Sequence, residues 1–125
     1  PVGAVLTVGT RVILSAHNER ERLHDPTAHA EILALQRASR QMGRWRLSDA
    51  CLYVTLEPCP MCAGALVNSR IGRLVYGASD PKAGAVDTLF QLLGDARLNH
   101  TVEVVGGICA EESAELLRAF FQARR

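Results

Sequence analysis

Several features that mark other protein classes are scarce in this chain of 125 residues. Aromatic residues make up 5% of it, too few for the stacking platforms on which single-strand nucleic-acid binders hold successive bases. No stretch approaches the roughly 20 apolar residues that span a bilayer, so we expect no membrane segment, and we expect no secretory leader. The net charge is +1, so a nucleic acid would have to be met by a local cluster rather than by the whole surface.

Cysteine is also sparse, and its pattern argues against a secreted, disulfide-linked framework. Two of the four cysteines form a Cys-x-x-Cys pair, Cys59 and Cys62, which suits a reducing, cytoplasmic setting. We expect Cys51 and Cys109 to be ordinary buried residues. Hydrophobic residues make up 48% of the chain, and its length suits a single globular domain over residues 1–125.

Two short motifs carry the chemistry, His29-Ala30-Glu31 and Pro58-Cys59-Pro60-Met61-Cys62. They supply one imidazole, two thiolates and one spare carboxylate. Three nitrogen and sulfur ligands are typical of a catalytic zinc site, because the fourth tetrahedral position stays open for water. Zinc lowers the pKa of water toward neutrality, and Glu31 would stand beside the metal without binding it. The set predicts a hydrolytic deaminase.

The setting of each motif strengthens this interpretation. Asp25-Pro26-Thr27 followed by apolar residues at helical spacing predicts a helix over about 28–42, with His29 in its first turn. A strand is predicted over 51–56, and Pro58 and Pro60 then mark the start of a helix that ends near 69. Two helix N-termini would therefore converge, and their free N–H groups and dipoles favour thiolates and an anion.

The other elements follow from periodicity and breakers. We expect strands over 2–8 and 11–17, joined at Gly9-Thr10, and short strands over 74–77 and 102–105. The pattern predicts a loop over 78–85, a short helix over 88–93, and an amphipathic helix over 111–125. The inward residues of that last helix would be Leu116, Leu117, Phe120 and Phe121. Helices alternating with strands after a hairpin predict an α/β protein, a three-layer α/β/α domain with a mixed sheet of about five strands.

Neither motif is specific when it is taken alone. A lone Cys-x-x-Cys can be a redox pair or half of a structural zinc site, and His-x-Glu is common by chance. The main alternative is a structural Cys₃His site with Cys51 or Cys109 as its fourth ligand. An unliganded glutamate beside the histidine is unusual in such a site.

Longer strings around the motifs resemble the bacterial tRNA adenosine deaminase family, within the cytidine deaminase-like fold. They are His24-Asp25-Pro26-Thr27-Ala28-His29-Ala30-Glu31 and the run from Tyr53 to Ala65. The resemblance extends from Pro1-Val2-Gly3-Ala4-Val5 to Phe120-Phe121. It implies one Zn²⁺ per chain on His29, Cys59 and Cys62, with Glu31 moving protons.

The resemblance also implies substrate contacts and partners. The substrate-binding positions would be the Ala30 backbone N–H, the base- or ribose-binding Asn18, and the RNA-gripping Asp80, Lys82 and Arg124. The substrate would be a tRNA anticodon stem-loop, bound by a homodimer whose sites are completed near the interface. On spacing alone, Asn18 is more typical of a turn. The small apolar run Ala63–Val67 could either pack against a second copy or be buried within one chain.

Two departures from the family are visible. The family normally begins with a helix before the Pro-Val-Gly-Ala-Val strand, whereas this sequence starts at that strand. Asp87-Thr88 replaces the family's usual Gly-Ser, which we expect to affect the loop rather than the chemistry. The predicted function is hydrolysis of adenosine to inosine at the wobble position of a tRNA anticodon. Alternatives are a deaminase of a free base or nucleoside, guanine or cytosine, and a non-catalytic zinc module that binds RNA, against which the intact Glu31 argues.

Overall fold

The structure is a computed structural model that describes residues 2–123, except for the side chains of 116, 117 and 120–123 in the last helix. Strands β1 (Gly3–Val8) and β2 (Arg11–His17) form the predicted hairpin. Gly9 at its turn has a φ of +60°, a left-handed conformation that glycine adopts without strain. The Gly9-Thr10 breaker therefore locates the turn correctly.

The sheet has five strands in the order β2-β1-β3-β4-β5, completed by β3 (Ala50–Leu56), β4 (Arg73–Ala78) and β5 (Glu103–Val105). β1 runs antiparallel to β2 and β3, whereas β3, β4 and β5 are parallel. The predicted mixed sheet is confirmed. Parallel neighbours need a crossover, and α3 (Pro60–Asn68) makes the one between β3 and β4.

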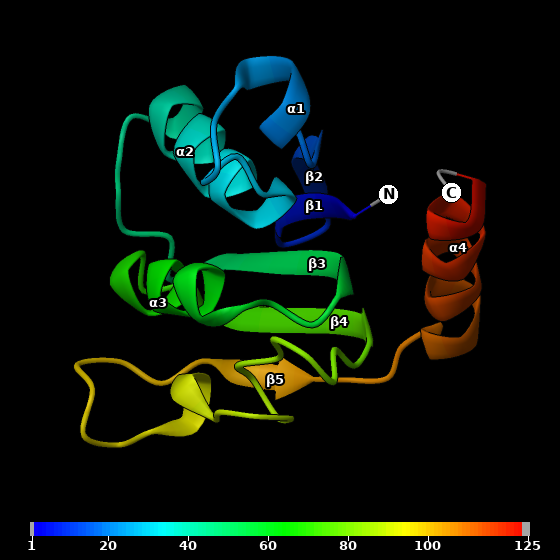
Figure 1. Cartoon of the computed structure of the whole chain (residues 1–125). Helices are drawn as coiled ribbons and strands as arrows, with labels where there is room; N and C mark the ends of the chain where they lie inside the picture. Colours follow the sequence, from blue (N-terminus) through cyan, green and yellow to red (C-terminus); the bar gives the residue numbers. More distant parts are fainter. Residues whose placement is uncertain (1, 124–125) are drawn as a thin grey trace.

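The longer helices cover both faces of the sheet, as expected of a three-layer fold (Figure 1). α2 (Ala30–Met42) packs on β1 and β2 and contacts α3 on one face. α4 (Ala110–Ala123) packs on β3 and β4. Two neighbouring residues of β4 show that α4 lies on the opposite face. Tyr76 joins the core under α2 and α3, whereas Gly77, which faces the other way, is so close to α4 that a Cβ there would collide with Ser113.

The core lies between the sheet and the α2–α3 layer. Leu6, Leu52 and Leu74 occupy one row across β1, β3 and β4, and all three are fully buried. Leu33 of α2 and Leu66 of α3 join the same cluster. Buried and more exposed positions alternate along most of β1 and β3. This alternation fixes their register, because a one-residue slip would turn the buried row outward.

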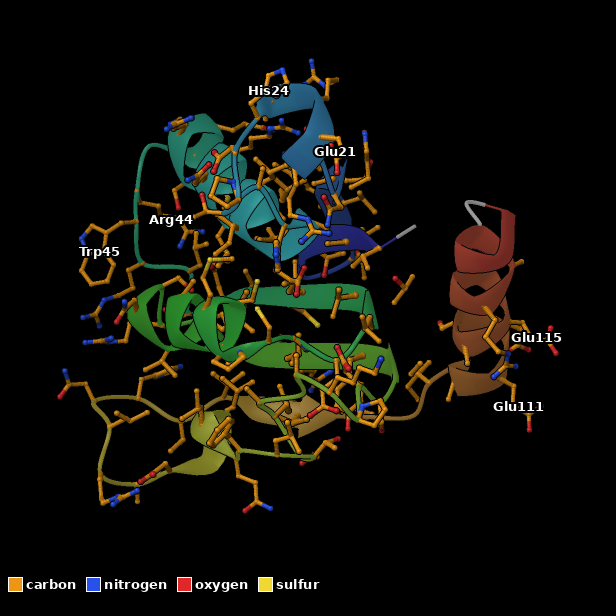
Figure 2. All side chains as sticks on the ribbon, in the orientation of Figure 1. Glu21, His24, Arg44, Trp45, Glu111 and Glu115 are labelled. Atoms are coloured by element: carbon orange, nitrogen blue, oxygen red, sulfur yellow. The ribbon has the colours of Figure 1, made fainter. Side chains whose placement is uncertain are left out.

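Three expectations differ from the structure. The helix expected over 88–93 is wrong: turns fill 85–88, and only a 3₁₀ turn, η1 (Leu92–Gly94), follows. The Leu89 and Phe90 N–H groups both bond to the Gly84 carbonyl, a pattern that does not propagate as an α-helix. The second difference is a four-residue helix that the sequence pattern did not predict, α1 (Arg20–Leu23), whose Glu21 is exposed at the surface together with the following His24 (Figure 2).

The third difference is Cys109, which is exposed rather than buried; it lies in a turn with a positive φ (54°) just before α4. Cys51 is half-buried. The inward side chains expected at Leu116, Leu117, Phe120 and Phe121 lie outside the described residues. Among residues 2–123, no helix is long and apolar enough to cross a bilayer.

Candidate metal centre and active site

His29 is the residue that caps the N-terminus of α2, one position earlier than the predicted first-turn placement. A tight turn sets it there: the Ala28 N–H donates to the Asp25 carbonyl, and the His29 N–H donates to the Thr27 carbonyl. The Asp25 carboxylate accepts hydrogen bonds from the Thr27 N–H and hydroxyl, at 2.8 and 2.7 Å. The local Asp-Pro-Thr sequence therefore fixes the imidazole at the helix start.

The two thiols are placed by the passage from strand β3 into helix α3. Cys59 caps this helix, Pro60 occupies its first turn, and Cys62 follows on the same side. Proline suits this position because the first-turn N–H that it lacks has no partner within the helix. Cys62 is fully buried, whereas Cys59 is half-buried.

The three side chains converge as the sequence predicted. The His29 Nδ1 atom lies 3.7 Å from Cys59 Sγ and 3.5 Å from Cys62 Sγ. All three ligand atoms lie within 4.8 Å of one another, so the group can hold a metal ion. With Zn–S of about 2.3 Å and Zn–N of about 2.0–2.1 Å, tetrahedral angles place N and S ligands roughly 3.6 Å apart. The donor set therefore fits zinc as it stands.

The ligand group speaks against the structural Cys₃His alternative. Over the part of the chain that the structure describes, the group comprises His29, Cys59 and Cys62, with neither Cys51 nor Cys109 among its members. Cys109 is exposed just before α4, on the opposite face of the sheet. Three ligands leave one tetrahedral position for a small molecule, which is the arrangement of catalytic zinc sites.

The pKa values of the two thiols are shifted in opposite directions. A hydrogen bond from Cys62, assisted by backbone N–H groups and by His29, lowers the pKa of Cys59 to about 5. The pKa of Cys62 is raised, because its proton is held by Cys59 and its sulfur is buried. Both sulfurs would bind a divalent cation as thiolates, so binding would release the remaining thiol proton.

Glu31 lies in the first turn of α2, and its side chain is 4% exposed. Burial raises the pKa of this carboxyl, while its own backbone N–H acts in the opposite direction. Glu31 is thus next to the ligand group without belonging to it. A carboxylate in this position can exchange protons with a molecule bound at the centre.

Asn18 and Ala30 lie next to the turn that carries His29. Asn18 follows β2, and its side-chain oxygen accepts a hydrogen bond from the Arg20 N–H at 3.0 Å, which is the turn-forming role that spacing alone predicted. The next residue, Glu19, donates its N–H to the Ala28 carbonyl, so Asn18 is held beside the His29 turn. Ala30 is fully buried at the first position of α2, where backbone N–H groups have no partner in the helix.

Asp80 and Lys82 lie in the loop after β4. The Asp80 side chain accepts hydrogen bonds from the N–H groups of Lys82 and Ala83, at 3.0 and 3.2 Å, which closes a turn. Lys82 is exposed at the surface of this turn. Arg124 lies outside the described residues.

Sequence reasoning missed two buried carboxylates that hold the loops around this centre. Glu19 pairs with Arg22 and Arg37 and links the α1 turn to α2. Glu57, directly before Pro58, is 2% exposed and binds the loop after β4. A glutamate that ends an apolar strand run was the available signal for Glu57, and Arg22 three residues after Glu19 was the signal for the other.

Comparison with known proteins gives this geometry a family. The MafB19-like deaminase model matches residues 1–125. The curated tRNA-specific adenosine deaminase of Bacillus subtilis is 51% identical over 100% of this chain and 78% of its own length. That of Haemophilus influenzae is 51% identical over 100% of this chain and 73% of its own. The chain belongs to the bacterial tRNA-specific adenosine deaminase family.

Solved structures agree on the fold of this deaminase family member. One, from a study of A-to-I editing by tRNA:A34 deaminases at the wobble position of transfer RNA, superposes with a TM-score of 0.89. It is 46% identical and covers 93% of this chain and 84% of its own. The guanine deaminase from Nitrosomonas europaea has a TM-score of 0.83 at 24% identity, covers 96% of this chain and 72% of its own, and shares the fold.

Proposed function

We propose that this deaminase converts adenosine to inosine at the wobble position of a tRNA anticodon. The observation that carries the proposal is the convergence of His29, Cys59 and Cys62 with the buried Glu31 beside them. The sequence around this group also supports it, since relatives named tRNA-specific adenosine deaminase are 51% identical over the whole chain.

In this proposal His29, Cys59 and Cys62 hold one zinc ion per chain, which supplies a Lewis acid that makes water a competent nucleophile near neutral pH. The overall reaction consumes water, forms a C6–O bond and releases the 6-amino group as ammonia. Glu31 accepts a proton from the attacking water and delivers it to N1 of adenine. It then takes the proton of the new C6 hydroxyl and passes it to the departing amino group, which leaves as ammonia, so no other acid is required.

Other residues of the chain hold and orient the base. The Ala30 N–H, free at the start of α2, would donate to the oxygen that arrives at C6. Asn18, held against the His29 turn, would contact the base or ribose through the side-chain atoms that its turn leaves available. Asp80, Lys82 and Arg124 would contact the surrounding RNA. Few aromatic residues are present for stacking, so recognition rests on a pocket that takes one extruded nucleotide.

In this proposal the chain binds the anticodon stem-loop of a tRNA, and it works as a homodimer. Support for the dimer comes from α3: Ala63, Leu66 and Val67 are buried within the chain, whereas Gly64 and Ala65 are half-buried and Met61 is exposed. The space that a Cβ on Gly64 would occupy is open, so another chain can approach this side of the helix closely. Much of the small apolar run is therefore intramolecular core, and only its outer side is available for pairing.

The test is inosine formation by the zinc-loaded chain on an anticodon stem-loop, with free adenosine, guanine and cytosine as parallel substrates. We expect inosine in the stem-loop and no product from the free compounds at equal enzyme concentration. The solved guanine deaminase of Bacillus subtilis is 39% identical over 63% of this chain and 50% of its own, with a TM-score of 0.62, so guanine is the essential comparison. Conversion of guanine without conversion of the stem-loop would contradict the proposal.

A further inference from the structure

Glu57 is a buried carboxylate with an unusual number of partners. Its side chain is 2% exposed and accepts five hydrogen bonds, at 2.5–3.1 Å. The donors are the backbone N–H groups of Asp80, Val86, Asp87 and Thr88, together with the Thr88 hydroxyl. Two carboxylate oxygens offer about four lone-pair sites, so the acceptor capacity of Glu57 is fully used.

All five donors belong to residues 80–88, which follow β4. Three of them are consecutive N–H groups, Val86 to Thr88, and all three point to the single oxygen Oε2. Consecutive N–H groups converge on one atom only when the backbone curls around it, and such a curl needs an anion at its centre. The side chain of Glu57 therefore determines the path of this loop.

Further contacts fix the loop in the same place. The Ala85 N–H donates to the Pro58 carbonyl at 2.9 Å, and the Tyr76 hydroxyl donates to Asp87 at 2.6 Å. Gly84 packs so closely on the Glu57 carboxylate that a Cβ there would collide with it. Asp87 and Thr88, the residues that depart from the family's Gly-Ser, both take part in this anchoring.

The anchored loop is the one that presents Asp80 and Lys82. The Asp80 N–H binds Glu57 directly, and its side chain in turn holds the N–H of Lys82. Glu57 lies two residues before Cys59, in the segment that carries the ligand into α3. One carboxylate thus ties the proposed RNA-contacting turn to the backbone of the metal-binding motif.

We infer that Glu57 is a positioning residue that sets the loop 79–88 against the metal-binding turn and thereby determines how tightly the RNA substrate is held. The inference rests on the proposed function, because it assigns Asp80 and Lys82 to substrate binding. It requires no contact between Glu57 and the reacting atoms, since every described partner of its carboxylate is a loop donor.

The decisive variant is Glu57→Gln, which keeps the size of the side chain. Glutamine has one acceptor oxygen and an NH₂ group, so donor would face donor at one side of the cluster. We expect the zinc content to remain at the wild-type level. Amide hydrogen exchange at residues 80 and 86–88 should accelerate at least about tenfold. The kcat/KM on the stem-loop should fall about 10- to 100-fold, mainly because KM rises. Glu103→Gln, at an exposed glutamate of β5, is the matched control and should leave all three unchanged.

A merely structural role predicts a different pattern, a smaller active fraction with lower zinc content and kcat but unchanged KM. If Glu57→Gln does not fold, two substitutions of Thr88 replace it. Thr88→Val removes the hydroxyl that donates to Glu57, and Thr88→Ser retains it. Thr88→Val should raise KM and speed exchange at 86–88, and Thr88→Ser should restore both. Unchanged exchange in these variants, or faster exchange with unchanged KM, would overturn the inference. A wild-type chain that makes no inosine in the stem-loop would refute the proposed function, while the exchange data would still decide whether Glu57 anchors the loop.

Discussion

Glu31 and Glu57 are both buried carboxylates, at 4% and 2% exposure, and their surroundings separate their roles. Glu57 is saturated by five donors from a loop, so it has no capacity left for a substrate proton. Glu31 lies beside three metal-ligand atoms. Residue type and burial are the same, and the partners decide which carboxylate holds the loop and which can handle protons.

The exchange of Glu31 for glutamine should separate chemistry from metal binding. Glu31→Gln keeps the shape and a hydrogen-bonding oxygen but cannot carry a proton, so zinc should stay bound while deamination slows. General acid–base groups contribute about 10²- to 10⁴-fold, and Glu31 serves several transfers, so the upper end or beyond is expected. Single-turnover inosine formation and elemental analysis measure the two effects, with Glu21→Gln on the exposed α1 as control (Figure 2). A Glu31→Gln enzyme of near-normal rate would remove Glu31 from the mechanism.

The proposed metal ligands can be tested by substituting residues inside and outside the ligand group. Cys62→Ser or His29→Ala should reduce zinc from about one ion per chain to a small fraction, because two remaining ligands cannot complete the site. Cys51→Ser and Cys109→Ser should keep full zinc, since neither residue is in the ligand group. Elemental analysis after dialysis gives the stoichiometry. Zinc loss in Cys51→Ser or Cys109→Ser would instead support a four-ligand structural site.

At the scale of the element, the ion-paired Glu19 makes the α1 turn part of the α2 scaffold. Hydrogen bonds from Arg37 and Arg22 lower the pKa of Glu19 below its ordinary value of 4.5. A lowered folded-state pKa contributes stability that is complete above the unfolded pKa and is lost as the pH falls through the folded one. The contribution should therefore be present at pH 7 and decline in acid.

Glu19→Gln should lower the free energy of unfolding at pH 7, and the difference from wild type should narrow as the pH falls below 4.5. Urea unfolding of both proteins at pH 7 and at several acid pH values measures that difference, in which the titration of other groups largely cancels. Glu21→Gln, at an exposed position of the same short helix, should show no such difference at any pH. If the difference in the free energy of unfolding between wild type and Glu19→Gln stayed constant with pH, the ion pairs of Glu19 would not contribute to stability.

The elements that the sequence predicted correctly are those with local signals. The Gly9-Thr10 breaker located the hairpin, Asp25-Pro26-Thr27 located the start of α2, and Pro60 located the start of α3. These signals work because turns and helix starts are determined by residues a few positions apart. The convergence of His29, Cys59 and Cys62 was predictable for the same reason, since each motif begins a helix.

The parts that were not predictable depend on partners far along the chain. Leu89, Phe90, Leu92 and Leu93 have helical spacing, yet the preceding N–H groups of 86–88 are captured by Glu57, some 30 residues earlier. In a regular helix Leu89 and Leu93 would share one face. In the structure Leu93 is buried, whereas Leu89 and Phe90 are exposed. Almost any residue can supply a backbone N–H group, so hydrogen bonds from the loop backbone to a distant carboxylate cannot be predicted from the sequence of that loop.

At the scale of the whole molecule, the candidate metal site draws its ligands from two different parts of the chain. His29 belongs to the layer packed on β1 and β2, and the cysteines belong to the β3–α3 crossover. A metal ion bound across this junction stabilises the folded state, because the site does not exist in the unfolded chain. Removal of zinc by a chelator should therefore lower the melting temperature of the wild type and leave Cys62→Ser almost unaffected. Scanning calorimetry of both proteins with and without chelator makes the comparison, and an equal shift in both would indicate an effect unrelated to the site.

The homodimer is the prediction that concerns more than one chain. The outer side of α3 offers Gly64, where a second helix can approach closely, next to the exposed Met61. A two-fold pairing through this side should bury more than the roughly 1,000 Å² expected of a biological contact. Light scattering at micromolar concentration should then give twice the chain mass of 13.6 kDa.

Gly64→Glu would place a charge in the contact and shift the mass toward the monomer, while Gly64→Ala, which adds only a methyl group, should keep the dimer. A monomer mass for the wild type, or a dimer that tolerates Gly64→Glu, would exclude pairing through α3, because a buried unpaired carboxylate at the centre of a helix contact costs several kcal/mol, about enough to dissociate a micromolar dimer.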